Sequence, residues 1–190
     1  MSSAPLGPSS ADTLASRLRR DLGIHLNHCY QCGKCSAGCP VAVDMDFTSS
    51  RALRMLQLDE PRLDRQVMAS EGIWLCLACE TCSTRCPQEV EVAKVMDFVR
   101  TEALARGLAH PKSRDILAFH HAFLDSIRTT GRLYEIGLVA DYKLRSRHFL
   151  KDVLLAPKML RRGKLPLLPH LIKGRDAMAR IFARTLGKGR

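Results

Sequence analysis

The sequence predicts an all-α protein, and three observations support that prediction. Near the N-terminus, apolar residues recur at the spacing of one helix face, namely Ala11, Leu14, Ala15, Leu18 and Leu22. The 36 residues between Cys39 and Cys76 contain no clean alternation of apolar and polar residues, which strands would require. From Pro111 onward a helical spacing returns, with Ile116, Phe119, Phe123 and Ile127 on one face.

The predicted helices follow one another along the chain. The first ends at Gly23, a residue suited to the position after a helix. Thr48, Ser49 or Ser50 caps a helix around residues 51–58, and Pro61 opens another that runs to about Ala69. A further stripe ends near Gly107 and contains Val92, Val95, Met96 and Val99. We expect the remaining helices at residues 149–159 and 176–186, the latter amphipathic and basic.

Composition and charge place the chain among folded globular proteins. It has 190 residues, of which 46% are hydrophobic and 26% charged. No apolar run approaches the ~18 residues that span a bilayer, so we expect no transmembrane segment. Arg19 and Arg20 are followed by Asp21 rather than by an apolar run, so we expect no targeting peptide and a cytoplasmic protein, peripheral to a membrane only through partners.

Eight cysteines form two identical runs. Each run has the spacing C-x2-C-x2-C-x3-C followed by proline, and every cysteine of the second run lies 47 residues after its counterpart. The first run is Cys29, Cys32, Cys35 and Cys39, and the second is Cys76, Cys79, Cys82 and Cys86. Pro40 and Pro87 end each run, because proline does not continue a helix. Gly33 and Gly38 are expected to let the backbone approach sulfur closely.

This spacing is the signature of two [4Fe–4S] clusters. Three closely spaced cysteines wrap around one cube, and in the bacterial two-cluster pattern the fourth cysteine ligates the other cluster. The sequence therefore predicts one cluster on Cys29, Cys32, Cys35 and Cys86, and a second on Cys76, Cys79, Cys82 and Cys39. Disulfides would need an oxidising compartment. Zinc on two C-x2-C pairs would leave four cysteines unused.

The two runs in a helical frame resemble the C subunit of heterodisulfide reductase. The motifs are CYQCGKCSAGCP and WLCLACETCSTRCP, and the segments GRLYEIG at 131–137 and LRRGKLPLLP at 160–169 resemble the same family. Related modules occur in the iron–sulfur subunits of succinate dehydrogenase and anaerobic glycerol-3-phosphate dehydrogenase. The resemblance implies an α-helical dicluster ferredoxin module at residues 11–108, after a flexible segment at 1–10, and a helical, basic partner-docking region at 109–190.

The resemblance also implies a function. In that family the C subunit relays electrons from a flavin-containing A subunit to a catalytic B subunit, so we expect these two partners. We expect no catalytic site in this chain, because nothing resembles a P-loop, a dinucleotide-binding turn or a hydrolytic triad. Two alternatives remain open. One is an electron-transfer subunit of a membrane-attached dehydrogenase of the succinate or glycerol-3-phosphate type, and the other is a nucleic-acid-binding iron–sulfur protein.

The second alternative arises from the uneven charge of the chain. Residues 145–190 contain 13 Lys and Arg but only 2 Asp and Glu, a surplus of +11 that equals the net charge of the whole chain. Basic segments favour acidic partners. This one lacks interleaved aromatic residues, which single-stranded nucleic acid would stack on, so we expect a protein partner and no nucleic acid.

Other residues near the runs are weaker candidates. His25 and His28 flank the first run, where they are expected to tune the cluster only by hydrogen bonding, because four cysteines suffice as ligands. Lys34 and Arg85 lie inside the runs, where positive charge favours a reduced cluster. His120 and His121 point about 100° apart on a helix, which argues against a shared site.

Overall fold

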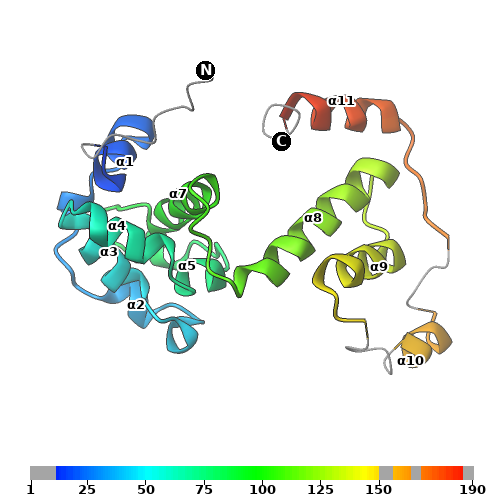
Figure 1. Cartoon of the computed structure of the whole chain (residues 1–190), viewed down its shortest axis with the longest axis horizontal. Coiled ribbons are helices and arrows are strands. Elements are labelled where there is room, and N and C mark those ends of the chain that lie inside the picture. The colour runs from blue at the N-terminus through cyan, green and yellow to red at the C-terminus, as the bar shows by residue number, and fades with distance from the viewer. Residues whose placement is uncertain (1–11, 150–155, 164–167, 186–190) are drawn as a thin grey trace, which may run out of the picture. The chain divides into compact units, whose positions relative to one another are not determined.

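The computed structural model of the chain describes residues 12–149, 156–163 and 168–185. Every regular element within these ranges is a helix, which confirms the all-α prediction (Figure 1). The chain divides into two compact units, Met1–Ser113 and Arg114–Arg190. In the described ranges, no helix is both long enough and apolar enough to cross a membrane.

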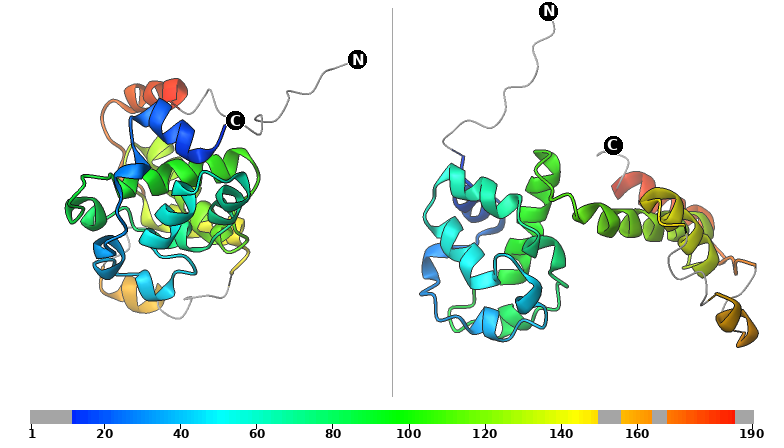
Figure 2. Two further views of the ribbon diagram at one scale, coloured as in Figure 1. Left: turned by 90° about the vertical axis from the view of Figure 1, so that its left-hand side faces the viewer. Right: turned by 60° about the horizontal axis from the view of Figure 1, so that its bottom comes forward.

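The first unit is a bundle of short helices, which both views of Figure 2 show gathered together. Its elements are α1 (Leu14–Leu22), η1 (Leu26–His28), α2 (Lys34–Ala37), η2 (Ala42–Asp44), α3 (Ser49–Gln57), α4 (Pro61–Met68), α5 (Gly72–Leu75), α6 (Thr81–Thr84) and α7 (Val92–Ala105). Helix α7 packs against α1, α4, α5 and α6, and α3 packs against α1, α2, α4 and η1. The two longer helices, α3 and α7, therefore hold the shorter ones in place.

Helix α1 ends as its sequence predicts, and a threonine caps its start. The Thr13 side chain accepts a hydrogen bond from the Ser16 amide, which satisfies one free N–H of the first turn. Gly23 follows the last turn at φ +67°, a left-handed conformation that glycine adopts without steric cost. A carboxylate from α4 adds a further anchor, because Asp64 accepts a hydrogen bond of 2.7 Å from the Leu14 amide.

The core of the first unit is aliphatic, as the scarcity of aromatic residues implies. The predicted stripe of α7 is buried on a helix that packs against α1, α4, α5 and α6. The largest fully buried apolar residues are Leu14, Leu18, Leu53, Leu56, Val67, Met68, Ile73, Val92, Val95, Met96 and Val99. Burying a side chain of this size stabilises a fold by about 1.5–3 kcal/mol, so this core supplies the rigid frame for the cysteine loops.

The second unit consists of α8 (Ser113–Thr130), α9 (Glu135–Ser146), α10 (Ala156–Arg161) and α11 (Arg175–Thr185). Phe119 of α8 meets the edge of Tyr142 of α9, with ring centroids 6.0 Å apart. Arg145 of α9 forms an ion pair with Asp125 of α8 at 2.7 Å. These contacts pair the two helices.

The face predicted for α8 is only partly buried. Phe119 is 44% exposed, and the other three predicted residues, Ile116, Phe123 and Ile127, are half-buried. The buried apolar residues of the helix are Ala118 and Ala122, so only small apolar side chains reach full burial.

The predicted C-terminal helices are present, with shifted bounds. α10 begins at Ala156, and residues 150–155 of the predicted helix lie outside the described ranges. α11 contains no buried residue, and Ile181 is 54% exposed. Residues 1–11, the Leu/Pro stretch at 165–167 and Leu186 also lie outside the described ranges.

Candidate iron–sulfur site

The two cysteine runs adopt one backbone, repeated after 47 residues. Helices α2 and α6 occupy equivalent positions, and each begins after a left-handed residue, Gly33 at φ +76° and Glu80 at φ +59°. A second equivalent pair, Gln31 at φ +62° and Ala78 at φ +49°, is also left-handed. Three of these four residues are not glycine, and a non-glycine residue in this region costs roughly 1–3 kcal/mol. The surrounding structure therefore imposes this shape on both loops.

The repeat extends through the hydrogen bonds of each loop. A short helix ends directly before each run, with η1 before Cys29 and α5 before Cys76. The amide of the fourth cysteine then bonds the carbonyl of Ser36 in one run and of Ser83 in the other, both at 3.1 Å. These bonds close a tight turn between the third and fourth cysteines of each run.

The same two serines fasten each loop to the helix that follows it. Ser36 accepts a hydrogen bond from the Ser50 amide of α3 at 2.9 Å, and Ser83 accepts one from the Ala93 amide of α7 at 3.3 Å. Both bonds satisfy a free N–H in the first turn of a helix. The sequence carries a signal for this role, because serine follows the third cysteine in both runs.

The two runs lie side by side in the fold. Helix α2 packs against α6, which brings together segments far apart in sequence. The Arg85 side chain from the second run fills the space beside Gly38 of the first, where a Cβ atom would overlap the guanidinium. Gly38 therefore accommodates an arginine of the other run, which differs from the predicted role of making room for sulfur.

The electrostatic neighbours of two residues reflect this pairing. Burial raises the pKa of Cys76, and Cys39 of the first run raises it further. Desolvation raises the pKa of Tyr30, and the thiols of Cys32, Cys86 and Cys29 add to that effect. Cys39, the fourth cysteine of the first run, thus raises the pKa of a residue in the second run. Cys86, the fourth cysteine of the second run, raises the pKa of a residue in the first run.

The eight cysteines are all free thiols, with unequal exposure. Cys35 is buried, Cys32 and Cys79 are exposed, and the others are intermediate. Burial raises the pKa of Cys35, Cys76 and Cys82, whereas a hydrogen bond with Thr81 lowers the pKa of Cys79. Thiolates at the buried positions need a positively charged partner, since burial disfavours the charged form.

The donors around the sulfur atoms fit a thiolate-bound cluster. Gln31 Nε2 donates to Cys29 Sγ at 3.4 Å, and the Val90 amide donates to Cys86 Sγ at 3.3 Å. Hydrogen bonds of this kind surround the ligands of iron–sulfur clusters and tune them. Among the described residues, no three His, Cys, Asp or Glu side chains group around a single metal position. A [4Fe–4S] cluster differs from a single-metal site, because each of its four irons is bound by one cysteine.

The histidines and the lysine that the sequence suggested as weaker candidates are all exposed. His25 and His28 stack on each other, with ring centroids 5.3 Å apart, and both are exposed. Lys34 is exposed as well. His120 and His121 are exposed on α8 in the second unit.

Several supporting residues were not predicted from the sequence. Asp46 accepts hydrogen bonds from the amides of Phe47, Glu71 and Gly72, which ties the first loop to the start of α5. Arg100 of α7 donates to the Cys76 carbonyl at 3.1 Å. Apart from the bond between neighbours Asp46 and Phe47, these contacts join residues far apart in sequence, and neither Asp46 nor Arg100 lies in a motif.

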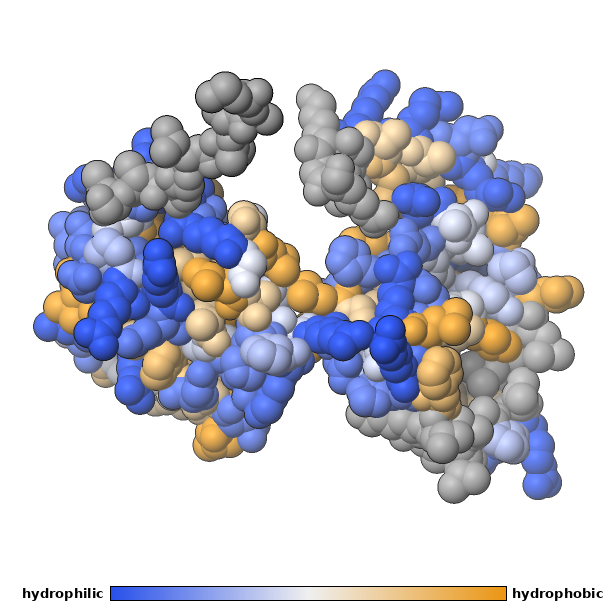
Figure 3. Space-filling model, viewed as in Figure 1, coloured by the Kyte–Doolittle hydropathy of each residue, from blue (hydrophilic) through white to orange (hydrophobic). Residues whose placement is uncertain are grey.

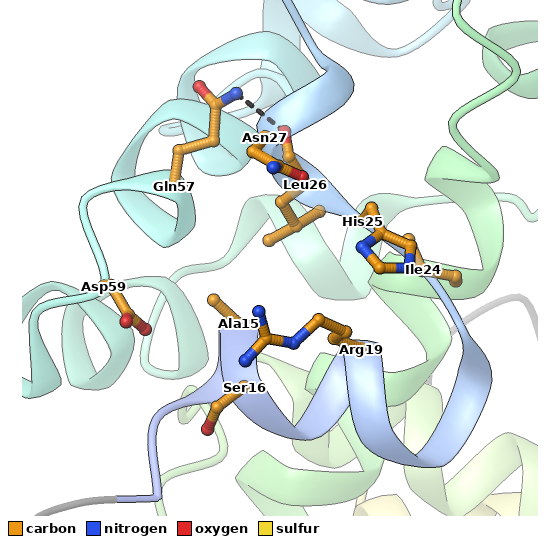
Figure 4. A pocket seen from close by; sticks show the side chains of 9 residues that line it. All are labelled: Ala15, Ser16, Arg19, Ile24, His25, Leu26, Asn27, Gln57 and Asp59. Carbon is orange, nitrogen blue, oxygen red and sulfur yellow. Dashed lines mark hydrogen bonds between the residues drawn. The ribbon is translucent and has the colours of Figure 1, made fainter.

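A polar cleft of about 180 Å³ lies beside the first loop (Figure 4). Its walls come from α1, η1 and the end of α3, and they include Arg19, His25 and Gln57. The Gln57 side chain at the end of α3 donates a hydrogen bond to the Leu26 carbonyl. This bond connects the α3 wall of the cleft to the segment that leads into Cys29.

Comparison with known proteins agrees with this geometry. Residues 25–90 match the 4Fe-4S dicluster domain family. The chain is 34% identical over 111 residues to an iron–sulfur C subunit of the CoB–CoM heterodisulfide reductase of Methanocaldococcus jannaschii, an alignment that covers 55% of this chain and 56% of the relative. It is 32% identical over 96 residues to the iron–sulfur C subunit of the Methanopyrus kandleri enzyme, covering 50% and 48%.

A third relative is the C subunit of the ferredoxin:CoB–CoM heterodisulfide reductase of Methanosarcina acetivorans. It is 31% identical over 98 residues, which cover 52% of this chain and 38% of the relative. The chain spans about half the length of the curated relatives it matches. This chain is therefore an iron–sulfur protein with a 4Fe-4S dicluster domain, and it is a relative of the C subunits of heterodisulfide reductases.

Proposed function

We propose that this chain is the electron-transfer subunit of a heterodisulfide reductase-like complex. Two [4Fe–4S] clusters relay electrons from a flavin-containing A-type subunit to a catalytic B-type subunit. The observation that carries this proposal is the pair of four-cysteine runs on one repeated backbone. The names of the relatives, which are all C subunits of reductases, support a place in a complex of several subunits.

The proposed ligands cross between the runs. One cluster is held by Cys29, Cys32, Cys35 and Cys86, and the other by Cys76, Cys79, Cys82 and Cys39. The contact between α2 and α6 supports this crossing, as do the effect of Cys39 on Cys76 and the position of Cys86 among the groups that act on Tyr30. Shared ligation keeps the clusters close together, which favours electron tunnelling between them.

The protein supplies position and environment, and the clusters supply the redox chemistry. A bound [4Fe–4S] cluster takes up and releases one electron at a time. The buried side of each site, at Cys35 or Cys82, shields the cluster from water. The exposed cysteines, Cys32 and Cys79, leave one side of each site open to an approaching redox centre. Two openings suit a relay with a donor and an acceptor.

The second unit is the proposed docking region. α11 contributes basic residues, namely Arg175, Arg180 and Arg184, and Figure 3 shows long hydrophilic side chains projecting over this helix. Ile181 is exposed on the same helix, at 54%, and Leu168, which precedes α11 in sequence, is exposed at 78%. Exposed apolar residues within a charged rim are typical of an interface. We expect the charges to steer a partner and the apolar residues to supply affinity.

Metal analysis tests the cofactor part of the proposal. Protein purified without oxygen should contain about eight irons and eight inorganic sulfides per chain, as two cubes require. Its reduced form should give an EPR spectrum of two interacting clusters. Stoichiometric zinc without labile sulfide would contradict the assignment.

Two cysteine variants test the crossing. Cys86→Ala should impair the cluster on Cys29, Cys32 and Cys35, and Cys39→Ala should impair the other one. Each variant is the control for its counterpart. If Cys86→Ala instead impairs the cluster on Cys76, Cys79 and Cys82, and Cys39→Ala the cluster on Cys29, Cys32 and Cys35, the crossing is wrong.

One substitution on α11 tests docking. Ile181→Glu should abolish co-purification with flavin-containing and cysteine-rich partners while both clusters remain loaded. Ala179→Glu, also exposed on α11 but two residues away and so on the other face, is the matched control. Equal recovery of partners with both variants would refute the docking face. Salt-dependent binding of the wild-type chain to DNA instead would favour the nucleic-acid alternative.

A further inference from the structure

Two glutamines link helix α3 to a sulfur atom of the first loop. Gln57, the last residue of α3, donates from Nε2 to the carbonyls of Leu26 at 2.7 Å and Cys29 at 2.6 Å. Its Oε1 accepts a hydrogen bond of 3.0 Å from Gln31 Nε2. Gln31 Nε2 also donates to Cys29 Sγ at 3.4 Å. Figure 4 shows Gln57 reaching from α3 to the Leu26 carbonyl.

This network determines which end of the Gln31 amide faces the sulfur. A glutamine amide has two N–H donors and one carbonyl acceptor. Gln57 uses both donors on backbone carbonyls, so it offers only its oxygen to Gln31. Gln31 must therefore present its nitrogen to Gln57, and the second N–H of that nitrogen is directed to Cys29 Sγ. The orientation follows from backbone carbonyls, whose role as acceptors is unambiguous.

The second run lacks this donor. The residue equivalent to Gln31 is Ala78, which has the same left-handed backbone and no polar side chain. The side-chain hydrogen bond of the second run is instead between Thr81 and Cys79, at 3.4 Å. There Cys79 Sγ donates to Thr81 Oγ1, whereas Cys29 Sγ accepts from Gln31 Nε2. A Cys79 thiolate bound to iron has no hydrogen to donate, so the Thr81 hydroxyl would then be the donor. Since the two backbones match, the two sites differ in the ligand that would receive a side-chain hydrogen bond.

We propose that Gln31, oriented by Gln57, raises the reduction potential of the cluster that Cys29 ligates. This inference rests on the proposed function, because it requires that cluster. Gln31 is a positioning residue in this proposal, since it acts on the cluster through the sulfur of a ligand. The second site has no equivalent of it, so the proposal concerns one cluster only.

The effect follows from the charge balance of reduction. The cluster gains one electron, no bond forms or breaks, and the added negative charge is shared with the ligand sulfurs. An N–H directed at Cys29 Sγ interacts more favourably with the more negative, reduced state. The donor therefore stabilises the reduced cluster relative to the oxidised one.

Redox titration of the loaded, full-length protein tests the proposal. Iron, sulfide and the EPR spectrum first establish that wild type and variant contain both clusters. The EPR signal of each cluster is then followed against potential, with dithionite as reductant. Gln31→Ala should disfavour reduction of the cluster on Cys29 by about tenfold, which is about 59 mV for a one-electron couple. The other cluster should keep its potential.

Thr81→Val is the matched control, because it removes the side-chain hydrogen bond of the second run. It should shift only the other cluster. If Gln31→Ala does not load, Gln31→Met is titrated instead, because methionine keeps the chain length and lacks the donor. Loaded variants at residue 31 in which neither potential moves, or both move equally, overturn the inference. Wild-type protein without labile sulfide would overturn the proposed function instead.

Discussion

Glu102 of α7 holds helix α1 through Arg17 and also pairs with Arg106, which directly follows α7. Its Oε2 accepts hydrogen bonds from Arg106 Nε at 3.1 Å and Nη2 at 3.0 Å, and from Arg17 Nη1. The Glu102 side chain is 8% exposed, and those of Arg17 and Arg106 are 22% and 21% exposed. Because this cluster is largely shielded from solvent, neutralising its only shared carboxylate should loosen α1.

The magnitude follows from the bonds that Glu102→Gln retains. A hydrogen bond to a charged group contributes about 1.5–3 kcal/mol and a neutral one about 0.5–1.5 kcal/mol, so each arginine loses about 1 kcal/mol. Arg17 keeps weaker ion pairs with Asp12 and Asp21, at 3.9 and 3.8 Å. Only the Arg17 bond joins α1 to α7, because Arg106 directly follows α7, so we expect the opening of α1 to become easier by about 1 kcal/mol, a factor of about 5.

Amide hydrogen exchange measures this opening in the loaded protein without unfolding it. Protection of the α1 amides should fall by about fivefold in Glu102→Gln, while that of α3 stays unchanged. Arg20→Ala is the control on the same helix, because its ion pair with Asp12 lies in solvent and such pairs contribute little. If the two variants lower protection equally, the shielded cluster does not anchor α1.

Three further predictions concern single contacts. Burial acts to raise the pKa of Asp46, but hydrogen bonds from three backbone amides outweigh it and lower the pKa, so Asp46→Asn should cost about 1 kcal/mol near neutral pH. That difference in thermal stability should stay constant from pH 8 to 5 and shrink only near and below the ordinary value of 3.8, as the carboxylate is protonated; shrinkage already at pH 6 would contradict the assignment. Ser36→Ala should lower amide exchange protection only in the first turn of α3, and Ser83→Ala only in the first turn of α7, each by about 1 kcal/mol. If both variants lower protection in the same helix, the two serines do not play equivalent roles in the two runs. Gly131→Ala should speed proteolysis before α11 more than Gly163→Ala, because both residues have positive φ but only the first would overlap a side chain.

Local patterns in the sequence were sufficient for the helices and for a prediction of the metal-binding residues. The stripe on α7 and the glycine after α1 depend on neighbours within a few residues, so spacing alone predicts them. The cysteine runs are likewise local, since three proposed ligands of each cube lie within seven residues. The partial burial of the predicted face of α8 could not be foreseen, because burial depends on what a helix packs against, which its own sequence does not contain.

Only the tertiary structure decided how the two runs relate to each other. Outside the cysteines, a serine and the prolines, the runs share little sequence, yet their loops have the same left-handed residues and the same turn. Gln57, Asp46 and Arg100 reach loop atoms that are 24 to 28 residues away in the chain, apart from the Asp46 bond to its neighbour. The contacts of Gln57 and Arg100 arise from packing of α3 and α7 against the loops. The sequence by itself predicted which atoms bind iron, and the packing determined which side chains surround the sulfur, because hydrogen bonds between distant residues leave no periodic pattern.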